Sequence, residues 1–381
     1  MSHLIESMVS ALGYSFVEGN RVQVLRNGDE IFPAMLNAIN EAQNTIDMVT
    51  FVYWTGTIAA KFSEALSKAA SRGVKTRLLL DAVGCRSMQQ PLIANMTRAG
   101  VTIAWFRPIA QWKVWKWDNR THRKLLLCDQ QVAFTGGVGI AEEWEGNANN
   151  PSEWRDTHFQ ITGPVVMNMY SGFLTNWYEA VDVDDEEILL PRRQLATGNA
   201  SIQVVRSPSS VNWSDIATVF RTLLSEARES IWITTAYFVP DDVLTGLLCS
   251  AVQRGVEVRL LVPGEHSDEA FSRLSGEDQF RLLLDEGVDI YLFAATMLHA
   301  KIMTVDHSLA VVGSANMNHR SMSKDEEFCL IIEDSETLEL LEQQFEADMG
   351  RSDALDLANW KERSLWRRIG EVATRLLREE L

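Results

Sequence analysis

A short pattern of histidine, lysine, aspartate and glycine occurs twice in this chain. The two copies are His122, Lys124, Asp129 and Gly136, and His299, Lys301, Asp306 and Gly313. Each residue of the second copy lies 177 positions after its counterpart in the first. A single His-x-Lys pair is expected by chance. Two pairs in one frame, each beside an apolar run, indicate a duplicated half-site.

The duplication extends well beyond the motifs. Four more segments of the first half return in the same order in the second half, with offsets of 180 to 187 residues. They are 22–26 and 202–206, 41–46 and 226–231, 72–80 and 254–262, and 100–103 and 287–290. Chance similarity explains any one pair but not an ordered series, and loop insertions explain the drift of the offset. The chain is therefore predicted to contain two copies of one structural unit.

Each unit alternates between residues typical of strands and residues typical of helices. In the first half, strands are predicted at 22–25, 46–53 and 76–80, and helices at 31–42 and 61–70. Such alternation is typical of an α/β fold, in which helices cover sheets that are partly parallel.

We place the boundary between the two units in the stretch 182–199, where an acidic run is followed by Pro191. The predicted domains are residues 1–190, with the motif at His122, and residues 191–381, with the motif at His299. A solvated loop inside a single domain is the alternative interpretation of the acidic stretch.

Composition limits the class of protein. The net charge of −17 over 381 residues argues against a nucleic-acid partner, because proteins that bind nucleic acid normally carry a basic surface. The four cysteines have no paired spacing and form no zinc pattern with the seven histidines, so we predict reduced thiols and no metal. We recognise no signal peptide and no apolar run of the ~18–20 residues that span a membrane, which predicts a cytoplasmic protein.

Two histidines and two lysines brought together suit phosphoryl transfer. One imidazole attacks phosphorus, the other handles the proton of the leaving group, and two ammonium groups hold the phosphate oxygens. This chemistry predicts that His122, Lys124, His299 and Lys301 meet in one site. The sequence contains no Gly-rich nucleotide-binding loop, so no cofactor is predicted.

Two segments combine basic and aromatic residues in a way that suits a phospholipid surface. Residues 107–124 hold six basic side chains and three tryptophans around the first motif. Residues 360–377 place apolar residues at helical spacing among arginines, which predicts a C-terminal amphipathic helix. Both patterns suit an anionic membrane. The alternatives are a tryptophan core with a solvated lysine face for the first segment, and docking on the protein body for the second.

The paired motif resembles that of the phospholipase D superfamily, and the resemblance covers nearly the whole chain. Within the superfamily, the sequence is most similar to bacterial cardiolipin synthases of the short type without N-terminal transmembrane helices. The residues that carry this closer similarity are Asn119, Trp154-Arg155-Asp156, the runs 235–241 and 318–321, and Trp360 with Arg363. The resemblance implies two phospholipase D-like α/β domains related by a pseudo-twofold axis, with both motifs at a shared central cleft.

The resemblance also implies catalytic roles for the motif residues. His122 is expected to be the nucleophile, and His299 the general acid and then the general base. Lys124 and Lys301 are expected to clamp the non-bridging phosphate oxygens, where negative charge develops in the transition state.

Supporting roles follow from the same resemblance. Ser314 and Asn316 are expected to add neutral hydrogen bonds to the phosphate. Asp156 and Glu327 occupy the family's positions for carboxylates that orient the imidazoles, and which acid serves which histidine is left open.

The remaining acids and histidines are expected to be structural. Asp129 and Asp306 belong to the catalytic motif, but we expect them to brace strands and loops rather than to contact substrate. His158 and His307 are predicted to be satisfied residues of the core.

Three positions depart from the family's pattern. Gly137 stands where serine is frequent in the superfamily, a difference that many cardiolipin synthases share. Gly139 stands where an asparagine parallel to Asn316 is expected, and Asp325 stands where asparagine is usual. The first half is therefore expected to contribute no amide to phosphate binding.

Taken together, the resemblance implies a phosphatidyltransferase of the cardiolipin synthase type. It would move a phosphatidyl group, expected to come from phosphatidylglycerol, to the hydroxyl of a second phospholipid through a phosphohistidine, and it would release glycerol. Hydrolysis to phosphatidic acid, a metal-independent nuclease and a lipid-binding protein with an inactive site are the alternatives. The expected partner is glycerophospholipid in an anionic membrane, and no nucleic-acid partner is expected. The protein is expected to bind this membrane peripherally, at its cytoplasmic face. The oligomeric state is left open.

Overall fold

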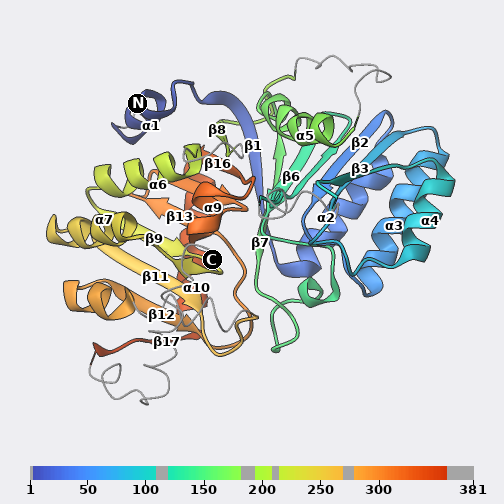
Figure 1. Cartoon of the computed structure of the whole chain (residues 1–381). Coiled ribbons are helices and arrows are strands. Elements are labelled where there is room, and N and C mark those ends of the chain that lie inside the picture. The colour runs from blue at the N-terminus through green and yellow to red at the C-terminus, as the bar shows by residue number, and fades with distance from the viewer. Residues whose placement is uncertain (1–2, 109–118, 182–193, 208–213, 269–278, 358–381) are drawn as a thin grey trace.

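The structure is a computed structural model that describes residues 3–108, 119–181, 194–207, 214–268 and 279–357 (Figure 1). The strands of the first half are β1 (Val17–Arg26), β2 (Thr45–Thr50), β3 (Lys75–Asp81), β4 (Thr102–Phe106), β5 (Leu125–Cys128), β6 (Val132–Gly136) and β7 (Thr157–Thr162). Those of the second half are β8 (Ala200–Arg206), β9 (Ser230–Thr234), β11 (Glu257–Pro263), β12 (Asp289–Phe293), β13 (Ile302–Val305), β14 (Leu309–Gly313), β16 (Phe328–Glu333) and β17 (Ser352–Ala354). A separate short pair is formed by β10 (Phe238–Val239) and β15 (Met317–Asn318).

The strand order confirms the duplication. Within the described residues, 15 strands form one mixed sheet. The first half runs β1-β7-β6-β5-β2-β3-β4, and the second half runs β8-β16-β14-β13-β9-β11-β12 in the same relative order, with β17 at its far edge. The α/β fold with two repeated units is therefore confirmed, and the predicted strands and helices of the first half are present with bounds shifted by a few residues.

Helices cover both faces of the sheet in each half (Figure 1). In the first half they are α2 (Asn27–Glu41), α3 (Thr57–Ser71), α4 (Gln90–Ala99), the short 3₁₀ helix η2 (Glu142–Trp144) and α5 (Val166–Ala180). The others are α1 (His3–Leu12), α6 (Asp215–Glu226), α7 (Asp242–Gln253), α9 (His319–Ser323) and α10 (Ser335–Met349). In β3, Leu78 and Leu80 belong to the outer apolar cluster, while Leu79 belongs to the central one, because alternate side chains of a strand face opposite ways.

The two halves share a central core. Strands β1 and β8 pair antiparallel, with Val17 opposite Ile202 and Asn20 opposite Ala200. The side chain of Asn20 donates to the carbonyl oxygens of Val17 and Ala200 and accepts from an amide at the start of α5. One apolar cluster includes buried residues of α5 from the first half and of α10 from the second half, so the halves are packed together as well as hydrogen-bonded.

The first helix packs with the second half rather than with its own. Leu4, Ile5 and Met8 on one face of α1 are buried in the same cluster as Val219 and Leu223 of α6. The predicted first domain, residues 1–190, includes this helix, although the helix packs in the apolar cluster of the second half. The predicted boundary itself lies in 182–193, outside the described residues.

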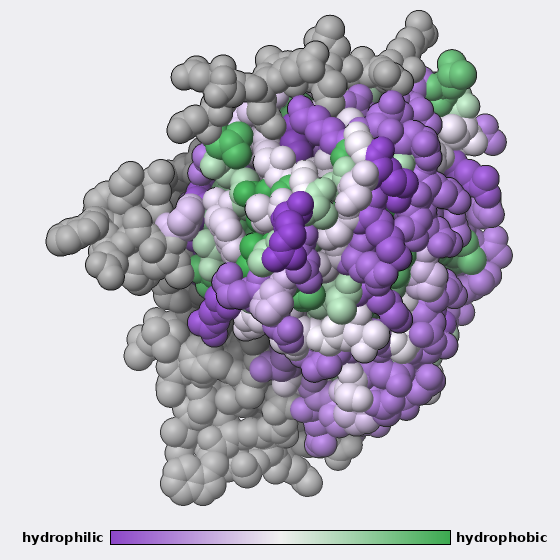
Figure 2. All heavy atoms as spheres, turned by 90° about the vertical axis from the view of Figure 1, so that its right-hand side faces the viewer, coloured by the Kyte–Doolittle hydropathy of each residue, from purple (hydrophilic) through white to green (hydrophobic). Residues whose placement is uncertain are grey.

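The described surface contains few exposed apolar side chains. Among the described residues, the large hydrophobic side chains that are exposed are Tyr14, Leu195, Val243, Leu282 and Leu340. Figure 2 shows the side of the molecule that carries the helices of the first half, and it is largely hydrophilic with small hydrophobic spots. No helix in these residues is long and apolar enough to cross a bilayer. The tryptophans of the segment 107–124 and the predicted C-terminal helix lie outside the described residues.

A buried ion pair ties the two halves together. Arg155, just before β7, donates from Nη2 to Oδ2 of Asp348 in α10 at 2.7 Å, and Arg26 contacts the other oxygen of Asp348 at 3.0 Å. The side chains of Arg155 and Asp348 are 1% and 3% exposed. Removing one partner of such a pair leaves an uncompensated buried charge, which costs more than the pair itself contributes.

We therefore predict that Asp348→Ala lowers the free energy of unfolding by about 3–5 kcal/mol, because it leaves Arg155 buried without its carboxylate. The matched control is Lys68→Ala, which removes a pair with Glu64 whose side chains are both 65% exposed. That change should cost no more than about 1 kcal/mol. Urea unfolding followed by circular dichroism measures both, and equal effects would contradict the assignment.

Candidate active site

Each motif histidine is bonded to a carboxylate from the other half of the molecule. His122 Nδ1 lies 3.0 Å from both carboxylate oxygens of Glu327. His299 Nδ1 lies 2.8 Å from Oδ2 of Asp156. The sequence left this pairing open, and the structure shows that it is crossed. In each pair the Nδ1–H donates to the carboxylate, so Nε2 of the neutral ring keeps its lone pair.

Two backbone bridges hold these crossed pairs in place. The amide of His122 donates to the carbonyl of Glu326 at 2.9 Å, and the amide of His299 donates to the carbonyl of Arg155 at 2.7 Å. Each of these carbonyls belongs to the residue directly before a carboxylate of the site. Thr121 and Glu326, and Arg155 and Leu298, form isolated parallel bridges between the halves. The backbone therefore sets the histidine–carboxylate geometry on both sides of the pseudo-twofold axis.

Both carboxylates are fully buried and stay ionised. Desolvation by burial alone would raise the pKa of Glu327, but His122 and Lys124 oppose it and hold this pKa at about 2. The pKa of Asp156 is also lowered, because hydrogen bonding and charge from His299 and the charge of Lys301 outweigh the desolvation of the carboxyl group. Ionised partners of this kind fix the tautomer and the orientation of an imidazole.

The two lysines lie beside their histidines, nearly removed from water. Lys124 Nζ donates to the carbonyl of His122 at 2.9 Å, and Lys301 Nζ donates to the carbonyl of His299 at 2.6 Å. Burial lowers the pKa of Lys124 to about 7, with a further contribution from Lys301. Burial likewise lowers the pKa of Lys301 to about 8. Two ammonium groups in one desolvated place favour an anion between them.

The surroundings of the two histidines differ. The side chain of His122 is 13% exposed, and the edge of Phe51 packs against its ring. The side chain of His299 is 7% exposed and is surrounded by three aromatic rings, those of Trp144, Trp154 and Tyr237. Burial, with the charge of Lys301 3.2 Å away, lowers the pKa of His299 to about 3, although Asp156 acts in the opposite direction. His299 is therefore neutral at neutral pH when no anion is bound.

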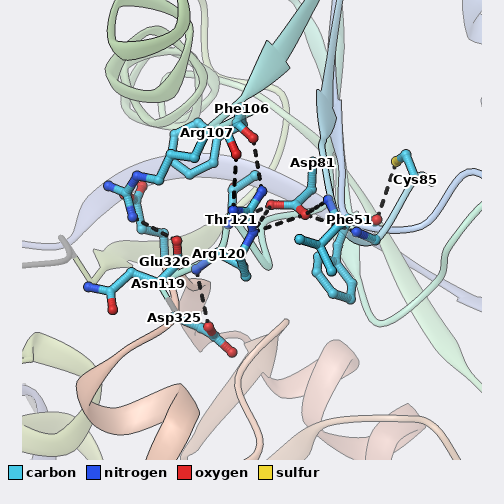
Figure 3. A network of polar contacts seen from close by, with 12 residues as sticks. Phe51, Asp81, Cys85, Phe106, Arg107, Asn119, Arg120, Thr121, Asp325 and Glu326 are labelled. Atoms are coloured by element: carbon cyan, nitrogen blue, oxygen red, sulfur yellow. Dashed lines mark hydrogen bonds and ion pairs between the residues drawn. The ribbon is translucent and has the colours of Figure 1, made fainter. Parts of the chain in front are cut away.

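The segment that leads into His122 is anchored at the carboxyl end of β3 (Figure 3). Arg120 Nε donates to Oδ2 of Asp81 at 3.0 Å, and its Nη2 donates to the carbonyl of Phe106 at 2.9 Å. The amide of Thr121 donates to the same Asp81 oxygen at 3.2 Å. Arg107 joins the network by donating to Oε1 of Glu326 at 2.8 Å. These contacts hold the approach to His122 from both halves.

Asp325, at a position where the sequence departs from the family's pattern, belongs to the same network. Its Oδ1 accepts from the amide of Arg120 at 3.3 Å and from Nη2 of Arg320 at 3.0 Å. Burial raises the pKa of this carboxyl group, with Arg320 and His122 acting in the opposite direction. Asp325 thus forms an ion pair with Arg320 beside the segment that leads into His122.

The motif aspartates lie far from this site. Asp129 follows β5 in a turn with positive φ, and its carboxylate accepts from the amides of residues 43–45 at 2.6 to 2.9 Å. Asp306 does the same for residues 228–230 at 2.8 to 3.1 Å. A four-residue strand separates each aspartate from its motif lysine, which is about 16 Å of extended chain. Their contacts are those of residues that brace a turn.

Ser314 and Asn316 have different surroundings. The hydroxyl of Ser314 donates to Oε2 of Glu327 and accepts from the amide of Phe328 at 2.9 Å, so it serves the carboxylate rather than facing outward. Among the described residues, Oδ1 of Asn316 is buried without a hydrogen-bond partner. Oδ1 of Asn316 is therefore available to accept a hydrogen bond from a hydroxyl donor.

One of the two predictions for structural histidines is wrong. His158 is buried as expected, and burial lowers its pKa to about 4, so the ring is neutral. His307 is not in the core, because its side chain is 48% exposed in the turn after β13, where Nδ1 contacts Glu342 at 2.8 Å. The apolar strand next to His307 suggested burial, but the turn directs its ring outward.

The sequence analysis missed Trp144. Its indole Nε1 donates to Oδ2 of Asp156 at 2.9 Å, and its ring packs edge-on against His299 with centroids 5.1 Å apart. The sequence offered no signal for this role, because the residue at the same offset in the second half, Ser321, is of a different type. Within the described residues, no group of three or more His, Cys, Asp or Glu side chains is arranged to hold a metal ion.

Comparison with known proteins agrees with this arrangement. The family model described as "Cardiolipin synthase, PLD-like domain" matches twice, over residues 35–160 and 220–349. "Cardiolipin synthase 1" of Bacillus anthracis is 31% identical over 385 residues, covering 98% of this chain and 75% of that protein. "Probable cardiolipin synthase YwiE" of Bacillus subtilis is 30% identical over 363 residues, covering 94% and 71%. "Cardiolipin synthase" of Clostridium perfringens is 31% identical over 370 residues, covering 95% and 77%.

Solved structures share the fold. The phosphatidylserine synthase of Haemophilus influenzae matches with a TM-score of 0.76 at 14% identity, over the full length of both chains. The polyphosphate kinase of Porphyromonas gingivalis matches with a TM-score of 0.60 at 15% identity, covering 95% of this chain and 53% of that one.

The electrostatics of the site lead to a prediction about His299. Because the charge of Lys301 lowers the pKa of His299, Lys301→Met should raise that pKa from about 3 by about 1 unit or more. Lys124→Met is the matched comparison and should raise it less, because Lys124 makes a smaller contribution. Titration of the imidazole signals by nuclear magnetic resonance measures both. An unchanged or lower pKa in Lys301→Met would contradict the placement of that charge.

Proposed function

Because the chain belongs to the cardiolipin synthase family of phospholipase D-like proteins, we propose that it transfers a phosphatidyl group from one phospholipid to the hydroxyl of another. The observation that carries the proposal is the pair of crossed histidine–carboxylate contacts beside two buried lysines. The proposed donor and acceptor are both phosphatidylglycerol, so the products are cardiolipin and glycerol.

In the first step, Nε2 of His122 forms a bond to phosphorus, and the bond between phosphorus and the glycerol oxygen breaks. The Nδ1 contact with Glu327 supports this role, because it leaves the Nε2 lone pair available and stabilises the ring as it becomes cationic. His122 is also the more exposed of the two histidines. The proton that the glycerol oxygen needs comes from His299, acting as general acid.

His299 must gain a proton before it can act as an acid. Burial and the charge of Lys301 lower its pKa to about 3 in the ligand-free protein. A phosphodiester anion bound between the lysines adds negative charge close to the ring, which raises the pKa of every cation around it. Substrate binding therefore loads the acid, and the lysines become fully charged when they are needed to hold the phosphate oxygens.

In the second step, the hydroxyl of the acceptor phospholipid gives its proton to His299. Its oxygen forms a bond to phosphorus, and the bond between phosphorus and His122 breaks. One phosphodiester replaces another, so the reaction needs no nucleotide. Oδ1 of Asn316, which has no hydrogen-bond partner among the described residues, is suited to accept a hydrogen bond from this hydroxyl.

The substrate is a component of a bilayer, so the protein is proposed to work peripherally at an anionic membrane, on the cytoplasmic face. The basic and aromatic composition of the segments 107–124 and 360–377 supports this placement.

Product analysis tests the proposal. Purified protein incubated with phosphatidylglycerol vesicles in chelator should produce cardiolipin and glycerol in equal amounts, as measured by mass spectrometry. His122→Ala and His299→Ala should both abolish turnover. Phosphatidic acid as the sole product would replace transfer by hydrolysis, and cleavage of DNA without lipid turnover would replace both.

The crossed carboxylates give a second prediction. Glu327→Gln and Asp156→Asn should each reduce kcat by about 10²–10⁴-fold, because the imidazole loses the anion that fixes its tautomer and stabilises its cation. The matched control is Glu342→Gln, which changes another histidine–carboxylate contact of 2.8 Å, outside the site. The Glu342→Gln variant should retain wild-type kcat. Comparable losses of kcat in all three variants would contradict the orienting role of Glu327 and Asp156.

A further inference from the structure

Trp144 and Ser321 are counterparts by sequence position, each 22 residues after its motif histidine. Trp144 ends the short helix η2 after β6, and Ser321 lies in α9 after β14. The two residues are 177 positions apart, which is the spacing of the motif histidines. The side chain of each donates to the carboxylate of its own half. An indole and a hydroxyl differ in residue type, so their common role is not visible in the sequence.

In the second half, two hydroxyls hold the carboxylate that serves His122. Ser321 Oγ donates to Oε1 of Glu327 at 2.6 Å, and Ser314 Oγ donates to Oε2. With both oxygens fixed, the carboxylate presents itself symmetrically to His122 Nδ1, at 3.0 Å from each oxygen.

In the first half, the indole takes the place of these hydroxyls. Nε1 of Trp144 donates to Oδ2 of Asp156 at 2.9 Å, and this same oxygen accepts from His299 Nδ1 at 2.8 Å. The other oxygen accepts from the amide of Thr157 at 2.8 Å. Trp144 is 2% exposed, so its N–H is a desolvated and rigidly placed donor.

The two glycines that depart from the family's pattern make room for this arrangement. A Cβ at Gly137 would lie 2.5 and 2.6 Å from the carboxylate oxygens of Asp156, and 2.8 Å from the carbonyl of His299. A Cβ at Gly139 would lie 2.6 Å from Cβ of Val52 and 3.2 Å from the Trp144 ring. A serine at the first position would therefore displace the carboxylate, and an asparagine at the second would overlap with Val52 and crowd the indole.

We propose that Trp144 is the positioning residue of the first half, whose indole N–H holds Asp156 on His299 as Ser314 and Ser321 hold Glu327 on His122. Gly137 leaves the space that the Asp156 carboxylate occupies, and Gly139 leaves space for Val52 beside the indole. The inference rests on the proposed function for its kinetic consequence only, because the contact of Asp156 with His299 can be measured in the absence of substrate.

The first test is a pair of variants observed at both histidines. Trp144→Phe removes the N–H and keeps an aromatic ring against His299, and Ser321→Ala removes one donor to Glu327. The ¹⁵N shifts of the imidazoles report which nitrogen carries the proton. Trp144→Phe should convert His299 from a single Nδ1–H tautomer into a mixture and leave His122 unchanged, while Ser321→Ala should affect His122 alone. Unchanged His299 shifts in Trp144→Phe would overturn the proposal.

The second test is kinetic. Trp144→Phe should lower kcat by about 10- to 100-fold, the usual effect of losing a hydrogen bond to a charged group, with KM within about twofold of wild type. The matched control is Trp232→Phe, which removes another indole–carboxylate bond of 2.9 Å, to Glu257 outside the site. The control should keep its kcat. Equal losses in both variants would reduce Trp144 to a packing residue and overturn the proposal.

A further variant separates a folding defect from a positioning defect. Gly137→Ala leaves Trp144 intact but places a methyl group against Asp156, so it should produce the same mixture of His299 tautomers and the same loss of kcat. Wild-type behaviour in Gly137→Ala would contradict the proposal even if Trp144→Phe failed to fold. If the wild type turned over no phospholipid, the proposed function would fail, and the tautomer measurements would still decide the role of Trp144.

Discussion

Two crossed backbone hydrogen bonds are the constraint on which the site depends. The amides of His122 and His299 donate to the carbonyls of the residues that precede Glu327 and Asp156, each time across the boundary between halves. The carboxylate that completes each histidine is thereby supplied by the opposite half. Neither half by itself contains a motif histidine together with its carboxylate, so the packing between the halves is a condition for the arrangement of the site.

The same crossing concentrates charge in a place with little water. Burial and neighbouring charges shift the pKa values of Lys124, Lys301, His299, Asp156 and Glu327, and burial is the largest influence on each. The carboxylates remain ionised because they accept several hydrogen bonds each, whereas the lysines have pKa values near neutrality. An anion placed between the two lysines would favour their charged forms.

The sequence analysis predicted the features that the two repeats share, and it missed features that differ between them. The ordered series of matched segments was sufficient to predict two α/β units and the meeting of the two motifs, because a duplicated unit keeps its strand order. The pairing of Glu327 with His122 was beyond reach, since it depends on how the halves approach each other. The role of Trp144 was missed because an indole donor and a hydroxyl donor share no composition signal. His307 was placed in the core because its neighbours are apolar, although the turn after β13 directs its ring outward.

Helix α1 gives the chain a particular order of assembly. It leaves the ribosome before any other described element, yet the apolar face formed by Leu4, Ile5 and Met8 is covered by α6, which begins at Asp215. More than half of the chain is therefore synthesised before that face finds its partner. Until then, the apolar face of α1 has no α6 to cover it. Once α6 has formed, the two helices are buried in one apolar cluster, so a segment from before β1 is packed into the core of the second half.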